Sequence, residues 1–315
     1  MILDKNFFLK KTIYNKSFYI GLIISLLLLS SYIDNFNNEI FLNVLSDVKI
    51  YNLLLASLLL MFAVYLRALR WKYLIHNNCV HNNDLYKGQL IGYFINNVLP
   101  LRIGELAKAY YIGNKYNISK SFIFGTVILE RIFDFFGLIL ILIILGNSTL
   151  FFDIPKILFF TVLFLFLFGF LLLFFLKNNR FKNFLKSKIG TVFFSIIDGY
   201  SKFKFNNILP VSTLTIAIWS IYILEVFLVQ NAFNLNLTIL QTTFILFISS
   251  LAMIVPSIPG NFGTFEGTVS FSLSLFGIFD DFGFSFILHL VSYIPYTIFG
   301  FIYCFQGIKF LLIKK

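Results

Sequence analysis

One apolar stretch of the chain carries three ionisable residues, and this combination restricts the fold more than any other feature. Residues 122–145 read FIFGTVILERIFDFFGLILILIIL, which is about the length that a helix needs to cross a bilayer. Glu130, Arg131 and Asp134 lie near the middle of this stretch. Each ionised side chain there costs roughly 2.5–3.5 kcal/mol, whereas each Leu, Ile, Phe or Val returns only about 0.3–0.6 kcal/mol. We therefore expect these side chains to face a protein interior or a water-filled cavity, with Arg131 as the nearest partner for the two acids, which share one helical face.

The composition indicates that the rest of the chain is also a membrane protein. Of its 315 residues, 59% are hydrophobic and only 12% are charged, which excludes an ordinary soluble domain. The net charge of +11 does not indicate a nucleic-acid partner, because the basic residues lie between the apolar runs, as in the cytoplasmic loops of membrane proteins. We expect an all-α, polytopic membrane helix bundle in which residues 1–315 form a single membrane domain with about six to eight spanning helices.

Charge asymmetry predicts the topology. The loop 177–208 carries seven basic residues and a single acid, which places it in the cytoplasm. The N-terminal apolar run lacks a small-x-small cleavage signal, so we expect it to remain as an uncleaved first span. Both termini are then cytoplasmic, and the protein is a multi-pass component of the plasma (inner) membrane. The full spans are expected at about 18–33, 51–69, 121–146, 156–176, 209–230 and 282–308.

Two further apolar stretches are interrupted by proline and glycine. Residues 88–99 are too short to span, end at Pro100 and have basic flanks, which favours a segment that re-enters from the cytoplasm over an interfacial helix. Residues 239–279 contain PSIPGNFGTFEG and fit either two full spans or a re-entrant hairpin from outside. Both stretches place an apolar run before a proline, then a glycine and a glutamate, then a long span. This weak repeat gives candidate halves of about 50–146 and 209–308, with inverted topology if the second hairpin enters from outside.

The broken segments and the charged span together predict a site for an anionic or zwitterionic head group. Helix N-termini present unpaired N–H groups and a partial positive charge, and arginine bonds phosphate oxygens bidentately. The candidate substrate-binding residues are Arg102, Glu105, Lys108, Glu130, Arg131, Asp134 and Glu266. The candidate hinge or re-entrant residues are Pro100, Gly104, Pro259, Gly260 and Gly263, where proline suits a helix start and glycine permits close backbone approach. The alternative is that these charges are internal ion pairs that brace the bundle.

No metal or cofactor is predicted. Residues 76–84, HNNCVHNND, contain two His, one Cys and one Asp, but their spacing matches no usual zinc pattern, so we expect a polar cytoplasmic loop. Cys79 and Cys304 are far apart on the predicted cytoplasmic side, which argues against a structural disulfide.

Three motifs in this order resemble the lysylphosphatidylglycerol synthase transmembrane family, also described as flippase-like domain or UPF0104-type membrane proteins. They are LPLRIGELAK at 99–108, the E-R-x-x-D element at 130–134, and P-x-x-P-G-x-x-G-x-x-E at 256–266. The resemblance covers essentially the whole chain. It implies a multi-helix membrane domain that, in the best understood relatives, moves an aminoacylated phospholipid between leaflets, while other relatives are linked to polyprenyl-phosphate sugar pathways. Relatives that synthesise the lysyl-lipid carry a soluble acyltransferase domain after the membrane part; because this chain ends at Lys315, we expect no lipid aminoacylation.

These observations favour a lipid flippase or transporter, and not an enzyme, that binds a phosphate-bearing head group of an aminoacyl-phospholipid or polyprenyl phosphate. One alternative is a polyprenyl-phosphate-dependent membrane glycosyltransferase, whose acidic pair would have to come from Asp280 and Asp281 or from Asp34. Another is a non-transporting scaffold for a membrane enzyme. Membrane lipid is the expected partner, with a homo-oligomer or a membrane enzyme as further partners.

Overall fold

The computed structural model describes six segments of the chain and four isolated positions. The segments are 48–75, 79–99, 103–146, 191–253, 259–279 and 282–313, and the isolated positions are 164, 167, 168 and 171. Several predictions lie outside these residues: the first span, most of the span at 156–176, Pro100, Arg102, Pro256, and the acids Asp34, Asp280 and Asp281.

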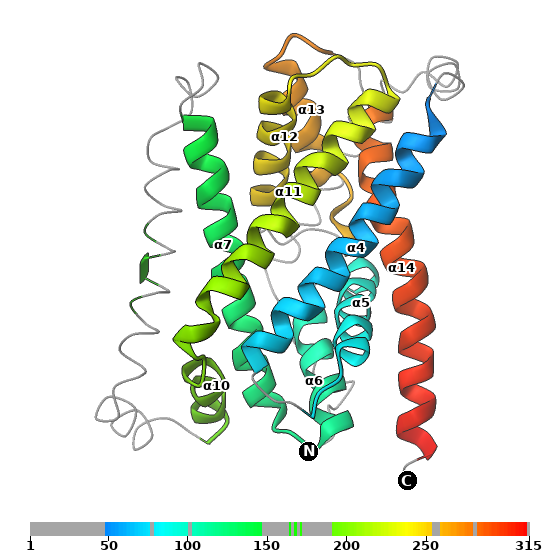
Figure 1. The fold of residues 1–315 in the computed structure, drawn as a ribbon. Helices are drawn as coiled ribbons and strands as arrows, with labels where there is room; N and C mark the ends of the chain where they lie inside the picture. The colour runs from blue at the N-terminus through cyan, green and yellow to red at the C-terminus, as the bar shows by residue number, and fades with distance from the viewer. Residues whose placement is uncertain are drawn as a thin grey trace, which may run out of the picture. The chain divides into compact units, whose positions relative to one another are not determined.

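All regular structure in the described segments is helical (Figure 1). The helices are α4 (Ile50–Ile75), α5 (Asn82–Val98), α6 (Gly104–Tyr116), α7 (Lys120–Gly146), α10 (Thr191–Ser201), α11 (Ile208–Ala232), α12 (Ile239–Ala252), α13 (Thr264–Ser274) and α14 (Phe282–Ile313). Single 3₁₀ turns at Phe205–Asn207 and Pro259–Asn261 precede α11 and α13. The prediction of an all-α, polytopic membrane fold is confirmed.

Three of these helical stretches are long and apolar enough to cross a membrane: Ile50–Ile75, Phe205–Ala232 and Gly283–Gln306. The outer face of α4 shows why they suit lipid. Ile50, Leu54 and Leu58 follow one another at four-residue spacing and are 66%, 62% and 67% exposed. Ala56 and Leu60, on the other side of the same helix, are buried. A continuous exposed apolar stripe is unfavourable in water and favourable against hydrocarbon.

The predicted loop 76–84 is shorter than expected, because α5 already begins at Asn82. The amides of Asp84 and Leu85 both bond the carbonyl of His81, which forms the first helical turn. Asp84 and Leu85 are buried, so packing holds a polar sequence in helical form.

Two helix triplets follow the plan of the predicted repeat. Helices α5, α6 and α7 contain 17, 13 and 27 residues, and α12, α13 and α14 contain 14, 11 and 32 residues. In each triplet a short helix with a glutamate in its first turn separates an apolar helix from a long one. The inverted relation of the two halves stays a prediction, as does their re-entrant character.

The chain forms two compact units, each built from separate stretches of sequence. Unit 1 comprises Met1–Met61, Tyr93–Gly104 and Ile223–Phe301, and unit 2 comprises Phe62–Gly92, Glu105–Tyr222 and Ile302–Lys315.

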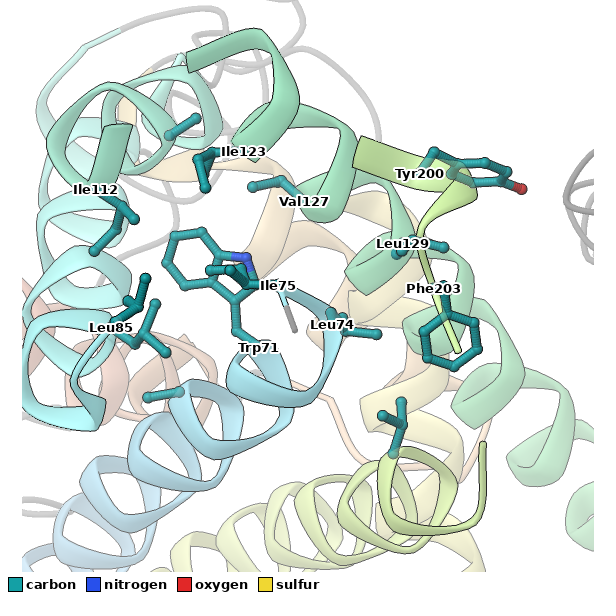
Figure 2. Close-up of a cluster of buried hydrophobic side chains, with 14 residues drawn as sticks. Trp71, Leu74, Ile75, Leu85, Ile112, Ile123, Val127, Leu129, Tyr200 and Phe203 are labelled. Carbon is teal, nitrogen blue, oxygen red and sulfur yellow. The ribbon is translucent and has the colours of Figure 1, made fainter. Parts of the chain in front are cut away.

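The apolar core of unit 2 surrounds Trp71 of α4. Figure 2 shows its indole among Leu85, Ile112, Ile123 and Val127, which come from α5, α6 and α7. The indole Nε1 donates to the hydroxyl of Thr126 over 2.9 Å, so the one polar group of the ring is satisfied. This core fixes α4 against α6 and α7, the helices that carry the charged side chains described next.

Helices α7 and α10 of unit 2 cross at two glycines. A Cβ atom on Gly125 would overlap the carbonyl oxygen of Ile196, and a Cβ atom on Gly199 would overlap that of Phe122. Such close backbone approach is typical of small residues between membrane helices, where dispersion contacts replace the hydrophobic effect as the source of association.

Candidate functional site

Asp134 of α7 lies between two arginines of α4 in unit 2. Its Oδ2 accepts a bond from Arg67 Nη2, and its Oδ1 accepts from Arg70 Nη2 over 2.7 Å. Arg70 also donates through Nη1 to the hydroxyl of Thr215 on α11 over 3.0 Å. The side chain of Arg70 is fully buried. Asp134 is therefore held by two cations that come from a single neighbouring helix.

A second set of bonds closes around Glu130, one helical turn before Asp134. Lys108 of α6 donates to Glu130 Oε2 and, over 3.1 Å, to Gln89 Oε1. Gln89 of α5 donates in turn to Glu130 Oε1 over 2.7 Å. All three side chains are buried, and the ammonium of Lys108 lies 4.8 Å from the centre of the Trp71 ring. The triangle supplies partners for both carboxylate oxygens of Glu130 in a place that water does not reach.

Arg131 joins Glu105 of α6 to Asp134 and reaches the protein surface. Its guanidinium is 3.0 Å from Glu105 of α6 and 3.2 Å from Asp134. The Arg131 side chain is 45% exposed, whereas those of Asp134 and Lys108 are 12% and 3% exposed. Arg131 is thus the accessible edge of an otherwise buried cluster, which we call the charged cluster. It consists of Arg67, Arg70, Gln89, Glu105, Lys108, Glu130, Arg131 and Asp134.

Counted over the residues that the structure describes, the charged cluster contains four basic side chains and three carboxylates, which gives one formal positive charge in excess. The buried Nε of Arg70 makes no hydrogen bond to any residue that the structure describes. A buried donor left in this way costs roughly 1–3 kcal/mol. The cluster therefore combines surplus charge with spare donor capacity, both of which suit an anion.

The structure brings together five of the predicted site residues: Glu105, Lys108, Glu130, Arg131 and Asp134. Arg102 lies outside the described residues. The basic partner of Glu130 is Lys108 and not Arg131, the neighbour in sequence that we expected to pair with it.

Arg67, Arg70 and Gln89 were not predicted as site residues from the sequence. Because α4 continues to Ile75, Arg67 lies eight residues, or about 12 Å, before the end of the helix. The signal that could have found them is their three-residue spacing, which puts two cations on one face of a continuous helix.

Glu266, the remaining predicted site residue, belongs to unit 1 and binds a histidine. Its Oε2 accepts the backbone N–H of Gly263 over 2.7 Å at the start of α13, and its Oε1 is 2.7 Å from His289 Nδ1 on α14. Both residues are buried. His289 was not identified from the sequence, although its place within an apolar span was a signal for it.

The predicted hinge glycines of unit 1 occupy a tight turn. Gly260 and Gly263 have φ values of +74° and +79°, which side chains of L-residues rarely adopt. A Cβ atom on Gly260 would lie 2.7 Å from the ring of Tyr293. Gly104, in unit 1 by its contacts, begins α6 and donates its N–H to Asn96 Oδ1 over 2.7 Å.

Two other acidic side chains are buried in helices. One is Glu225 of α11, in unit 1. Asp84, from the stretch HNNCVHNND, bonds Lys115 over 2.6 Å and Tyr116 over 2.5 Å. Within the described residues, no group of three His, Cys, Asp or Glu side chains is placed to hold a metal ion.

Long apolar helices and a buried charged cluster, in described segments whose regular structure is all helical, define a polytopic membrane protein. The model of the lysylphosphatidylglycerol synthase TM region matches residues 18–300, and the chain belongs to this family.

Two curated relatives come from Methanocaldococcus jannaschii. The chain is 31% identical over 213 residues to the UPF0104 membrane protein MJ1078, and the aligned region covers 66% of this chain and 91% of that protein. It is 29% identical over 117 residues to the UPF0104 membrane protein MJ1595, covering 36% of this chain and 35% of that protein. No solved structure matches the chain.

Proposed function

We propose that the protein binds a lipid through its phosphate-bearing head group and moves it between the leaflets of the membrane, without covalent chemistry. The observation that carries this proposal is the excess positive charge of the charged cluster, two of whose arginines lie on α4, a helix long and apolar enough to cross a membrane. An excess cation inside a bilayer is costly unless an anion accompanies it for part of the working cycle.

Arg131 is the residue best suited to meet the head group. Glu105 and Asp134 hold its guanidinium, while 45% of the side chain stays accessible. Guanidinium groups bond two phosphate oxygens at once and lose little rotamer entropy when they are already positioned. A phosphate that approaches Arg131 would also come under the field of Arg67 and Arg70 behind Asp134.

The substrate class that fits is an aminoacyl-phospholipid or a polyprenyl phosphate. Both present a phosphate for the cations. An aminoacyl-phospholipid also presents an amine, for which Glu105, with a 24% exposed side chain, is the nearest acceptor beside Arg131. The family name refers to lysylphosphatidylglycerol, a lipid with both groups. The setting we propose is the plasma (inner) membrane, with several passes and cytoplasmic termini.

A bracing role for the same charges is favoured by one observation: every carboxylate of the charged cluster already has a basic partner. In that case the protein would scaffold a membrane enzyme or a second copy of itself. The two roles differ in their response to a folded variant in which Arg131 has lost its charge. Lipid movement should slow if the charges bind the head group, and it should not change if they only brace the helices.

The test measures the movement of fluorescent lipids in liposomes that contain the purified protein, with chemical quenching of the outer leaflet. We compare the wild type with Arg131→Gln, using labelled phosphatidylglycerol, lysylphosphatidylglycerol and a polyprenyl phosphate. Lys202→Gln is the matched control, because Lys202 forms an exposed ion pair with Asp198 in the same unit. We expect Arg131→Gln to slow movement of one of these lipids at least tenfold, with the control unchanged. Equal rates in folded wild type and Arg131→Gln would contradict the proposal and favour the scaffold.

A further inference from the structure

The start of α13 in unit 1 places a carboxylate in a fixed position inside the protein. Gly263 caps the helix, and its N–H donates to Glu266 Oε2. The turn before it, with Gly260 and Asn261 both at positive φ, has a rigid and unusual backbone. Glu266 is 2% exposed, so its second oxygen, Oε1, is available only to a neighbour inside the protein.

That neighbour is His289, whose ring is held on several sides. Its Nδ1 lies 2.7 Å from Glu266 Oε1. The rings of Phe262 and Phe265 have their centres 4.7 Å and 4.6 Å from the imidazole centre, and the ring of Tyr293 is 5.8 Å away. The imidazole is therefore fixed in orientation by one bond and three aromatic contacts.

The other ring nitrogen of His289, Nε2, has no such contact. No hydrogen bond reaches it from the residues that the structure describes, although His289 is 3% exposed and lies within the apolar stretch Gly283–Gln306. The described titratable side chains that face the ring are Glu266, from α13, and Tyr293, from α14 itself. The turn before α13 adds only Phe262, which does not titrate.

An imidazole held in this way can exchange a proton. When Nδ1–H donates to the carboxylate, Nε2 carries the lone pair and can accept a proton. The resulting imidazolium keeps its Nδ1–H bond to Glu266, whose negative charge compensates the new positive charge. The reverse step returns the same proton from Nε2 to water, and no other bond forms or breaks.

We propose that His289, positioned by Glu266, is a proton-exchange site that couples lipid movement to the movement of protons across the membrane. This rests on the proposed function and deepens it by naming the energy source. A purely structural His289 would need only its packing and its bond to Glu266, and the state of Nε2 would not matter.

The first test is the response of lipid movement to a pH difference imposed across the liposome membrane. The quantity measured is the ratio of the rates with and without the difference. We expect a ratio of at least threefold in the wild type and in His81→Gln, and a ratio near one in His289→Gln. His81 is the matched control because it is exposed and lies outside the spans. A ratio of one in the wild type would overturn the proposal. So would folded His289→Gln protein that shows the same ratio as the wild type.

The second test does not depend on transport or on the folding of a His289 variant. The chain has three histidines, so imidazole ¹⁵N signals can be assigned by substitution of His76 and His81 alone. We expect the Nε2 signal of His289 to move reversibly between its protonated and its neutral position when the pH is changed. A signal that keeps one position throughout would overturn proton exchange. If the wild type moves no lipid at all, the proposed function fails, and this titration alone decides whether His289 exchanges protons.

Discussion

At the scale of single residues, the charged cluster stabilises the fold only as long as its members remain paired. We predict that Lys108→Met costs about 3–5 kcal/mol, because it leaves Glu130 buried with Gln89 as its remaining partner. The double change Lys108→Met with Glu130→Gln should recover most of this loss, because it removes the uncompensated charge as well. Thermal unfolding in detergent measures the stability of the single and of the double variant.

The matched control is the exposed pair Lys202–Asp198, in which the lysine side chain is 62% exposed. Breaking this pair with Lys202→Gln should cost less than about 1 kcal/mol. If the double variant at Lys108 and Glu130 is as unstable as the single one, the loss comes from packing around these side chains and not from charge.

A second prediction at this scale concerns pH and the contact of Asp84 with Lys115 and Tyr116, outside the membrane spans. Burial alone would raise the pKa of Asp84, but the hydrogen bonds from Lys115 and Tyr116 outweigh it and lower that pKa. Burial, together with the hydrogen bond to Asp84, raises the pKa of Tyr116 to about 12.

The two shifts give opposite pH limits. The stabilisation from Asp84 is present above its unfolded pKa of about 3.9 and is lost as the pH falls through its lower folded pKa. The stabilisation from Tyr116 is present below its unfolded pKa of about 10 and is lost as the pH rises to the folded value. We expect Asp84→Asn to lower the unfolding temperature near pH 7 and to have progressively less effect below pH 4, where it approaches the wild type. A difference that is the same from neutral to acid pH would show that folding does not lower the pKa of this carboxylate.

At the scale of helices, the crossing of α7 and α10 depends on two glycines. We predict that Gly125→Ala destabilises the protein by about 1–3 kcal/mol, because its Cβ atom would overlap a backbone carbonyl that cannot rotate away. A helical glycine without this contact would instead gain up to about 1 kcal/mol from the same change.

The measurement is again the unfolding temperature, with Ser220→Ala at an exposed position of α11 as the control. Gly199→Ala should behave like Gly125→Ala, because Gly125 of α7 lies against the backbone of α10 and Gly199 of α10 lies against the backbone of α7. A stabilising effect at either glycine would mean that the helices do not cross at this point.

The sequence predicts most helices well because their apolar runs are long. The predicted span 121–146 corresponds to α7 (Lys120–Gly146), and 209–230 corresponds to α11 (Ile208–Ala232). The start of α5 was missed because Asn82 and Asp84 are weak helix formers, and tertiary contacts decide their conformation.

The candidate site was predicted only in part, and the reason is physical. Helical spacing places Glu130 and Asp134 on one face, but it does not show which distant cations meet them. Arg67 and Arg70 are 67 and 64 residues away from Asp134 in sequence, and their pairing depends on how α4 packs on α7. His289 and Glu266 are likewise 23 residues apart.

At the scale of the whole molecule, two helices define the direction in which the chain crosses the membrane. At one end of α4, the amide of Lys49 bonds the carbonyl of Ala232, the last residue of α11. At the other end, Asn207, just before α11, donates to the carbonyl of Tyr73. The start of α4 thus lies beside the end of α11 in unit 1, and the end of α4 lies beside the start of α11 in unit 2. The 25 residues of α11 span about 37 Å, which is enough to cross the hydrocarbon core.

This arrangement predicts the sides from which two cysteines can be labelled. Cys79 is exposed just beyond the end of α4, and Asn236 is exposed just beyond the end of α11. In a Cys304→Ser background, we expect a membrane-impermeant maleimide to reach Cys79 only in inverted vesicles. In the same background with Cys79→Ser and Asn236→Cys, it should react only in intact cells. This direction follows from our expectation that the basic loop 177–208 is cytoplasmic, since cytoplasmic loops are enriched in Lys and Arg. Labelling of both positions from one side would show that α4 and α11 do not cross the membrane, whereas reversed labelling would place the basic loop outside.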